Sequence, residues 1–326
     1  MDILARESAF RIEPIDDDRA LEALVPHWWK LWDSIPTATP FQSPAWLIAW
    51  WRSFRPGRLR SVAVFKDGRL IALAPFYLED GGQRLLPIGI SLSDYLDVLI
   101  DPRYESAVGP ALLAHLLEAH EVLCCEELSP DAAALRLWAG SEWKASIQPH
   151  NASPVLAPIV MPKTKLRKLR MARHRVARRR GAIECAGPES AIGLLRELIR
   201  LHGARWKARG EPGVLADDGV RRFLELALPG LAAAGILRFH GLRFGGDMAG
   251  VYLGFISNGR AYAYLGGFDP AFAHESPGTV LIGHAIDEAV REGAREFHFL
   301  RGREEYKYQW GATDRWNSRL ELRRPA

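Results

Sequence analysis

The chain has 326 residues, of which 48% are hydrophobic, and this length and composition favour two globular domains over one. No run of eighteen apolar residues is present, and residues 1–13 lack the apolar stretch of a signal peptide, so neither a transmembrane helix nor a secreted precursor is expected. The cysteines Cys124, Cys125 and Cys185 have no partner at metal-ligand spacing. We therefore expect no zinc site, no other metal and no disulfide framework, in a reduced cytoplasmic protein.

The basic residues are unevenly distributed. The formal net charge is only +4 and the isoelectric point about 9.0, which by itself is weak support for an anionic partner. Residues 163–180, however, carry ten Lys or Arg side chains and no acidic one. The segment has high helix propensity and no Pro or Gly, so it predicts a basic helix.

The first half of the chain predicts an α/β arrangement. Ser43 followed by Pro44 is typical of a helix start, with a hydroxyl cap and a proline at the first helical position. Asp67-Gly68 lies between two alternating apolar runs, which predicts a hairpin. The expected helices are Pro26–Trp32, Pro44–Phe54 and Val108–His120, and the expected strands lie within Arg60–Leu78, around Leu85, and at Val98–Ile100 and Val122–Cys125.

The second half repeats this order of helix, helix and hairpin. Its hairpin turns at Gly245-Gly246-Asp247, and Phe244 lies 179 residues after the corresponding Phe65, which favours a duplicated domain over a solenoid. The expected helices are Ala191–Arg209, Asp218–Ala234 and Thr279–Glu292, and the expected strands are Ile236–Phe244, Met248–Ile256, Arg260–Gly266, Arg295–Leu300 and Ser318–Leu322. Prolines cluster between residues 149 and 162, so we expect an N-terminal domain over 1–155 and a C-terminal domain over 156–326 that opens with the basic helix, residues 163–180.

The most informative stretch is residues 261–311. It reads as a strand, a tight turn that opens a helix, a second strand, and a polar-aromatic loop at residues 305–311. A helix N-terminus after a strand presents free backbone N–H groups and the positive end of the helix dipole to an anion such as a pyrophosphate. This order resembles the C-terminal half of a GNAT acyltransferase, in particular the CelD-like (cellulose-biosynthesis-associated) and Fem-type branch. The resemblance implies two tandem GNAT-like α/β (α+β) domains, each a mixed, mostly antiparallel sheet flanked by helices.

The turn Ala273–Thr279 is the place where that resemblance puts coenzyme A. Its sequence fits only one of three positions of the Gln/Arg-x-x-Gly-x-Gly/Ala motif, namely Gly278. The alternative is an ordinary helix start, with Ser276 as cap and Pro277 as the first helical residue. We expect Ser276, Gly278 and Thr279 to bind the donor, and the basic helix to add Arg170 and Arg173.

Two further segments resemble CelD-like sequences and suggest catalytic groups. Gly302, Tyr306, Lys307 and Trp310 match the Gly-x-x-x-Tyr-Lys-x-x-Trp segment, in which Tyr306 would protonate the departing thiolate and Lys307 would hold the oxyanion or a phosphate. The alternative is that the aromatic residues pack and the lysine is solvated. Asp94 and Asp97 match an Asp-Tyr-x-Asp segment and are candidate general bases, although loop carboxylates more often form caps and turns.

Aromatic residues are candidates for the acceptor site, with core packing as the alternative interpretation. The segment Thr39–Trp46 resembles the family's N-terminal signature. Trp206, at the end of a predicted helix, is expected to reach the same cleft. The candidate substrate-binding residues are Phe41, Gln42, Trp46, Tyr95, Trp206, Tyr264, Phe268, Arg301 and Trp310.

The resemblance implies transfer of an acyl group from acyl-CoA or acetyl-CoA to an amine of a sugar, lipid or cell-envelope precursor. One alternative is a Fem-like transferase that uses aminoacyl-tRNA, and another is a catalytically silent GNAT pair that serves as a scaffold in polysaccharide or lipid synthesis. The basic helix has three interpretations: a solvated surface, a binding site for ligand phosphates or tRNA, or a contact with the anionic inner face of the membrane. DNA is not an expected partner, because no helix-turn-helix or zinc pattern accompanies the helix.

Overall fold

The computed structural model describes residues 10–117, 122–137, 143–207 and 210–324. The chain divides into two compact units, one running to Asn151 and resuming at Trp316, and the other comprising Ala152–Arg315. Two strands, β9 (Lys144–Leu156) and β15 (Thr313–Arg323), contribute residues to both units. The last strand therefore belongs largely to the first unit, whereas the sequence analysis assigned all residues after 155 to the C-terminal domain.

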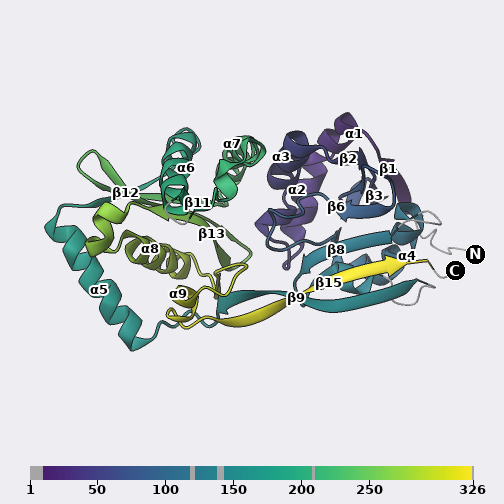
Figure 1. Ribbon diagram of the computed structural model, residues 1–326. Helices are drawn as coiled ribbons and strands as arrows, with labels where there is room; N and C mark the ends of the chain where they lie inside the picture. The colour runs from purple at the N-terminus through teal and green to yellow at the C-terminus, as the bar shows by residue number, and fades with distance from the viewer. Residues whose placement is uncertain (1–9, 118–121, 138–142, 208–209, 325–326) are drawn as a thin grey trace, which may run out of the picture. The chain divides into compact units, whose positions relative to one another are not determined.

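The first unit contains two groups of paired strands (Figure 1). One is antiparallel in the order β1-β3-β4-β7, comprising Arg11–Ile15, Ser61–Lys66, Arg69–Ala74 and Leu99–Ile100. The other runs in the order β15-β8-β6-β5-β2, where β8 is Val122–Leu128, β6 is Arg84–Pro87, β5 is Phe76–Glu79 and β2 is Gly57–Leu59. In this second group only the β6–β8 pair is parallel.

The helices of the first unit are α1 (Asp18–Ala23), α2 (Val25–Ser34), α3 (Pro44–Phe54) and α4 (Glu105–Leu116). The predicted start of α3 is confirmed: the Ser43 hydroxyl accepts a hydrogen bond from the Trp46 N–H at 3.3 Å, and Pro44 is the first helical residue. The predicted hairpin at Asp67-Gly68 is also confirmed, and both residues have the positive φ that such a two-residue turn requires.

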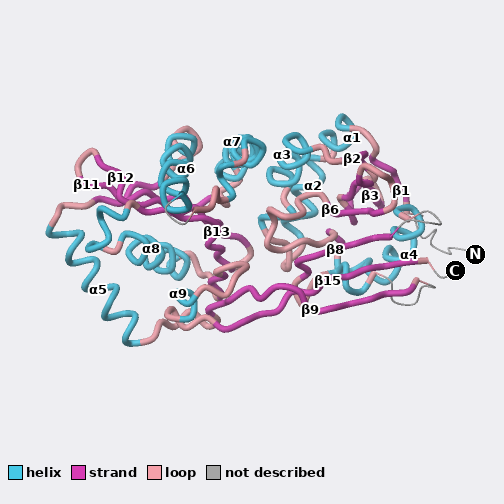
Figure 2. The backbone as a smooth tube through the Cα atoms, in the orientation of Figure 1, coloured by secondary structure: helices cyan, strands magenta, loops and turns pink. Residues whose placement is uncertain are grey.

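The second unit has one sheet with helices on both faces (Figures 1 and 2). Its strands follow the order β10-β11-β12-β13-β14-β9, where β10 is Ala182–Cys185, β11 is Leu237–Phe244, β12 is Asp247–Ser257, β13 is Arg260–Phe268 and β14 is Glu296–His298. Helices α6 (Ala191–Lys207) and α7 (Asp218–Ala233) cover one face, and α8 (Pro277–Arg291) covers the other, with α5 (Lys163–Arg178) packed on α8. A short helix, α9 (Glu305–Tyr308), lies in the segment that was expected to be a loop.

The cores explain why these elements form where they do. In the second unit, Tyr252, Phe297, Phe299 and Trp310 are buried with the apolar rows of α5 and α8. In the first unit the strands and α4 enclose a separate core that includes Phe76, and Leu320 from β15 is buried in it. Among the described residues, no helix is both long and apolar enough to span a membrane.

Candidate donor and acyl site

Strands β13 and β14 separate soon after they meet. Their parallel pairing covers three residue pairs, Arg260 with Glu296 through Tyr262 with His298, after which β14 ends and β13 continues to Phe268. The register of β13 against β12 also shifts beside Tyr264, and such a bulge bends a strand and increases its local twist. Ala261 and Tyr262 are buried, whereas the following four residues of β13 are partly or fully exposed. The second unit therefore has an accessible strand edge where the two parallel strands part.

The chain leaves β13 at this opening and enters α8 through a 3-10 turn, Pro270–Glu275. Pro277 is the first residue of α8, as the helix-start interpretation predicted. Ser276 has a left-handed φ of 55° and its side chain does not cap the helix. The first helical hydrogen bond is donated by Val280 to Ser276, so the N–H groups of Gly278 and Thr279 precede it at the positive end of the helix dipole.

Helix α5 supplies two guanidinium groups to the same turn. Arg175 Nη2 donates to the Ser276 hydroxyl at 3.2 Å, while its Nε is buried and has no hydrogen-bond partner among the described residues. Arg179 forms an ion pair with the buried Glu275 at 3.1 Å, and its guanidinium lies over Phe244 and Phe272. The two arginines are four residues apart and therefore lie on one face of the helix. Sequence analysis missed both, although this spacing within the basic segment was visible.

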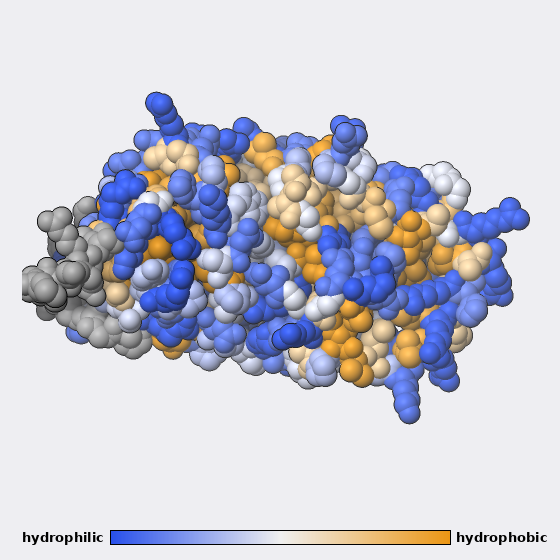
Figure 3. Space-filling model, turned by 180° about the vertical axis from the view of Figure 1, so that it is seen from behind, coloured by the Kyte–Doolittle hydropathy of each residue, from blue (hydrophilic) through white to orange (hydrophobic). Residues whose placement is uncertain are grey.

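The arginines that the sequence analysis assigned to the donor lie elsewhere on α5. Arg173 forms an ion pair with Asp287 of α8, so it anchors the two helices to each other. Arg170 is exposed, as are Lys163, Arg167, Lys168 and Arg178. Helix α5 thus has an inner face that contacts α8 and the turn, and an outer face that is basic and open to solvent; hydrophilic side chains also dominate the face of the second unit drawn in Figure 3.

Lys307 organises the loop after β14. It is 2% exposed, and its ammonium group donates to the carbonyl oxygens of Leu300, Arg301 and Gly302 at 3.0, 2.6 and 3.0 Å. Glu304 lies 2.9 Å from the same nitrogen. This geometry favours a structural clamp over the expected oxyanion role, because three carbonyl oxygens already engage the three N–H donors.

Tyr306 lies beside this clamp on α9. The residue is 41% exposed, and its ring contacts Phe299 edge to face with the ring centroids 6.3 Å apart. Since Phe299 follows β14 directly, Tyr306 is held near the point where β14 parts from β13. The phenol is therefore placed so that a reacting group could reach it from solvent.

Asp94 and Asp97 belong to the first unit. Asp97 accepts hydrogen bonds from the N–H groups of Val98, Ala133 and Ala134 at 2.8–2.9 Å, so it caps the short turn Ala133–Arg136. Burial raises the pKa of Asp97 to about 7, against the opposing effect of these three donors. It lines a cavity of about 210 Å³ together with Arg136 and Glu105. Asp94 is 6% exposed, and its backbone carbonyl accepts from Asn317 Nδ2 at 3.2 Å.

The N-terminal signature is part of the core of the first unit. Phe41 and Trp46 are fully buried and pack edge to face at 5.2 Å. Trp46 Nε1 donates to Ser93 Oγ at 2.9 Å, and Gln42 donates to the Tyr95 carbonyl at 2.7 Å. These contacts support the packing interpretation for Phe41, Gln42, Trp46 and Tyr95.

The remaining candidates lie in the second unit. Tyr264 and Phe268 are half-buried on the part of β13 that has left β14, and Phe268 lies beside Gly278. Trp206 is half-buried on α6 beside His202, and Arg301 is half-buried in the loop that Lys307 holds. Trp310 is fully buried, with the ammonium of Lys165 4.1 Å from its ring centroid. The structure therefore brings Phe268 to the turn that holds Ser276, Gly278 and Thr279. Tyr264 lies earlier on the same strand, and its ring packs against Phe255 at 5.6 Å.

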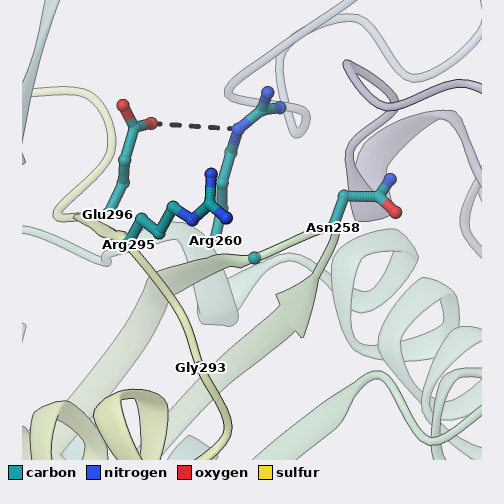
Figure 4. A pocket seen from close by; sticks show the side chains of 6 residues that line it. Asn258, Arg260, Gly293, Arg295 and Glu296 are labelled. Carbon is teal, nitrogen blue, oxygen red and sulfur yellow. Dashed lines mark ion pairs between the residues drawn. The ribbon is translucent and has the colours of Figure 1, made fainter.

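A separate cavity lies at the opposite end of β13 (Figure 4). It measures about 470 Å³ and is lined by Asn258, Arg260, Arg295, Glu296 and two glycines. Glu296 is held by Arg315 at 2.9 and 3.0 Å and by His298 at 2.9 Å, with Arg260 at 3.8 Å. This cavity lies at the start of both parallel strands, away from the turn that leads into α8.

Comparisons with known proteins bear on the fold of the chain. The family model described as an acetyltransferase (GNAT) domain matches residues 163–308. The structure of FemX has a TM-score of 0.63 at 11% identity, covering 94% of this chain and 96% of that one. L-PGS from Bacillus licheniformis has a TM-score of 0.57 at 13% identity, with coverages of 95% and 93%. A tandem GNAT protein from the clavulanic acid biosynthesis pathway has a TM-score of 0.50 at 14% identity, with coverages of 98% and 100%. No curated protein sequence matched.

The chain thus has the mixed α/β, tandem GNAT-like fold that the sequence predicted. The segment that matches the GNAT domain model, residues 163–308, contains the parting strands and the start of α8 described above.

Proposed function

We propose that the protein is an N-acyltransferase that moves an acyl group from acyl-CoA to an amine of a sugar, lipid or cell-envelope precursor, as its resemblance to CelD-like sequences implies. The observation that carries the proposal is the parting of β13 from β14, after which β13 leads through a short turn to the N-terminus of α8. The exposed edge of β13 would take the acyl and pantetheine portion. The free N–H groups of Gly278 and Thr279 would take the pyrophosphate.

Arg175 completes this donor site in our proposal. Its guanidinium already reaches Ser276, and its buried Nε lacks a partner among the described residues. A phosphate oxygen accepts well from such a fork of N–H groups. Arg175 and Arg179 therefore replace Arg170 and Arg173 as the arginines that we assign to the donor.

In the proposed reaction, the neutral amine attacks the thioester carbonyl and a C–N bond forms. The C–S bond then breaks, the thiolate leaves, and the nitrogen releases its extra proton to solvent. The departing thiolate needs a proton, which the exposed phenol of Tyr306 would supply. Lys307 would act as a positioning residue, because it holds the loop from which Tyr306 projects. Tyr306→Phe should then lower the rate of CoA release in the presence of an accepted amine by roughly 100-fold, while leaving acyl-CoA affinity unchanged.

Thermal denaturation with CoA, acetyl-CoA and longer acyl-CoAs tests the donor. A ligand at 100 times its Kd adds about 2.7 kcal/mol of stability, which is a shift of a few degrees for a chain of this size. Arg175→Ala should weaken the interaction by about tenfold or more, the loss expected for one charged contact. Arg170→Ala on the outer face of α5 is the matched control and should bind as the unaltered protein does. No shift with any CoA species would contradict an acyl-CoA donor.

A Fem-like, aminoacyl-tRNA-dependent reaction is the second candidate, and the exposed basic face of α5 favours it. Arg167, Lys168, Arg170 and Arg178 present four cations on this face. Binding of tRNA that weakens steeply with salt and is lost in Arg167→Glu/Arg170→Glu would support this candidate. The proposed contact with a membrane surface is tested separately, by measuring whether the same double variant loses binding to anionic vesicles. Specific binding of any acyl-CoA would count against a silent scaffold.

A further inference from the structure

A cysteine and two histidines from distant parts of the sequence meet in the second unit. Cys185 on β10 and His240 on β11 are directly opposed in the antiparallel register, so their side chains lie on the same face. His284 lies on α8, which packs against this part of the sheet. The potential ligand atoms of Cys185, His240 and His284 all lie within 4.8 Å of one another.

The polar atoms of this cluster are incompletely satisfied. His240 is 1% exposed, and its Nδ1 lies 3.2 Å from Cys185 Sγ. Within the described residues, His284 Nε2 is buried and has no hydrogen-bond partner. Two imidazoles also meet edge to face here, with ring centroids 4.9 Å apart. Buried polar atoms without partners are uncommon, and a bound ion is one of the few arrangements that satisfies such a set.

Glu288 lies next to the cluster and contacts His240. It lies one helical turn after His284, and its Oε2 is 2.8 Å from His240 Nε2. Metal-binding histidines commonly direct their other ring nitrogen to a carboxylate, which fixes the tautomer and the ring orientation. With Nε2 turned to Glu288, His240 Nδ1 is left facing the thiol of Cys185.

We propose that Cys185 Sγ, His240 Nδ1 and a ring nitrogen of His284 bind one zinc ion, with Glu288 as the carboxylate that orients His240. One thiolate and two imidazoles form a ligand set suited to zinc. In tetrahedral zinc sites the ligand atoms are about 3.3–3.6 Å apart, a separation that follows from metal–ligand distances of about 2.0–2.3 Å. The observed separations therefore need only small side-chain rotations to reach that geometry.

The three ligands come from an edge strand, its neighbour and a helix, so the ion would pin β10 to β11 and α8. Cys185 is exposed, which gives the metal a route from solvent and leaves a fourth position for water. His284 lies seven residues into α8, or about 10 Å along the helix from Pro277. The metal site is therefore distinct from the proposed donor site and does not depend on it.

The sequence analysis expected no zinc site, because no cysteine has a partner at the usual spacing. The ligands are instead assembled by strand register and helix packing, because His240 lies 55 positions after Cys185 in the sequence. A pattern of short spacings cannot detect a site of this kind.

The direct test uses the full-length protein without a histidine tag, stripped of metal with a chelator. Zn²⁺ is titrated against a chromophoric competitor, and Co²⁺ is added separately as a spectroscopic probe. We expect one ion per chain, together with a thiolate-to-cobalt charge-transfer band and the intense visible bands of a tetrahedral site. Failure to compete for Zn²⁺, or a Co²⁺ spectrum without the thiolate band, would overturn the proposal.

Substitutions of the proposed ligands test whether the zinc ion binds at this cluster. Cys185→Ser and His284→Gln should each weaken Zn²⁺ binding by about 100-fold or more, and Glu288→Gln by about 10–100-fold, as expected for an outer-layer partner. His174→Ala, which removes an exposed histidine on α5, is the control and should bind zinc normally. Melting curves of the metal-free proteins show whether each variant is folded. Cys185→Ser replaces a single atom of an exposed residue on the edge strand β10. Unchanged affinity in folded Cys185→Ser and His284→Gln would show that any bound zinc lies elsewhere, and the assignment would be wrong.

Discussion

At the scale of a single residue, we expect Lys307 to contribute to the stability of the folded protein. Its buried ammonium donates to three successive carbonyl groups, those of Leu300, Arg301 and Gly302. Lys307→Met keeps the chain length and removes the donors, so we expect a loss of about 2–4 kcal/mol of unfolding free energy. Urea denaturation measures this loss. Lys168→Met on the exposed face of α5 is the control and should change stability by less than about 0.5 kcal/mol; equal effects would show that the clamp contributes nothing.

Glu296 makes the free energy of unfolding depend on pH in acidic solution. Hydrogen bonds from His298 and from Arg315 hold the pKa of this carboxyl well below its usual value of 4.5. Because the folded state binds the proton less readily than the unfolded state, the contribution of Glu296 is complete above pH 4.5 and declines as the pH falls below it. Glu296→Gln should therefore cost about 2 kcal/mol near pH 7, and this difference should shrink in more acidic solution.

Chemical denaturation of both proteins across this pH range checks the expectation for Glu296. Glu225→Gln alters an exposed carboxylate of α7 and serves as the control, with little difference at any pH. A difference between Glu296→Gln and the unaltered protein that stays constant from neutral to acidic pH would mean that the ion cluster does not couple folding to protonation.

Residue roles are the part about which the sequence says least. The segment Thr39–Trp46 was a candidate for the acceptor site with core packing as the alternative, and its internal hydrogen bonds and buried aromatics favour packing. Arg175 and Arg179 could not be distinguished from the other basic residues of α5 without knowing which face meets α8. A residue's chemistry is readable from sequence, but its partners depend on packing between distant segments.

At the scale of elements, the contact between α5 and α8 depends on a missing side chain. A Cβ at Gly283 of α8 would lie 2.5–2.7 Å from the methyl groups of the fully buried Leu169 of α5. Gly283→Ala should therefore destabilise the protein by about 1–3 kcal/mol through overpacking, despite the better helix propensity of alanine. The change is measured as a lowered denaturation midpoint.

Gly193 on α6 provides the matched control for Gly283, because nothing lies within 4 Å of a Cβ at that position. Gly193→Ala should stabilise the protein by up to about 1 kcal/mol, the difference in helix propensity. Adding Leu169→Ala to Gly283→Ala should cost less than the sum of the two single changes, since the smaller side chain relieves the overlap. Additive costs would show that the two residues do not compete for space.

Helices and strands were far more predictable from the sequence than the contacts that individual residues make. Local signals placed the hairpins at Asp67-Gly68 and Gly245-Gly246-Asp247, and helices α3, α5, α6, α7 and α8 begin within two residues of their expected starts. Strands β1, β9 and β10 were not predicted. Their sequences lack a clear alternation, and pairing with strands far along the chain defines them.

At the scale of the whole molecule, the return of the chain to the first unit was not visible in the sequence. Residues 318–322 were predicted as a closing strand, but a strand pattern does not say which sheet it joins. In the structure, β15 pairs with β8, with Leu320 opposite Cys125 and Leu322 opposite Leu123. The proline cluster at 149–162 marks where the chain leaves the first unit, and no comparable signal marks where it comes back.

This topology predicts where a C-terminal substitution will act. Leu320 is fully buried in the core of the first unit, so Leu320→Ala should cost about 2–5 kcal/mol. Hydrogen exchange should then accelerate mainly in β8 and β15, and β11 and β12 should keep their protection, because local unfolding follows the contacts that were lost. Leu281→Ala on α8, equally buried but in the second unit, should give the reverse pattern. If both variants accelerate exchange equally in β8 and β12, the two units unfold as one cooperative structure, and the division at Asn151 and Trp316 has no energetic counterpart.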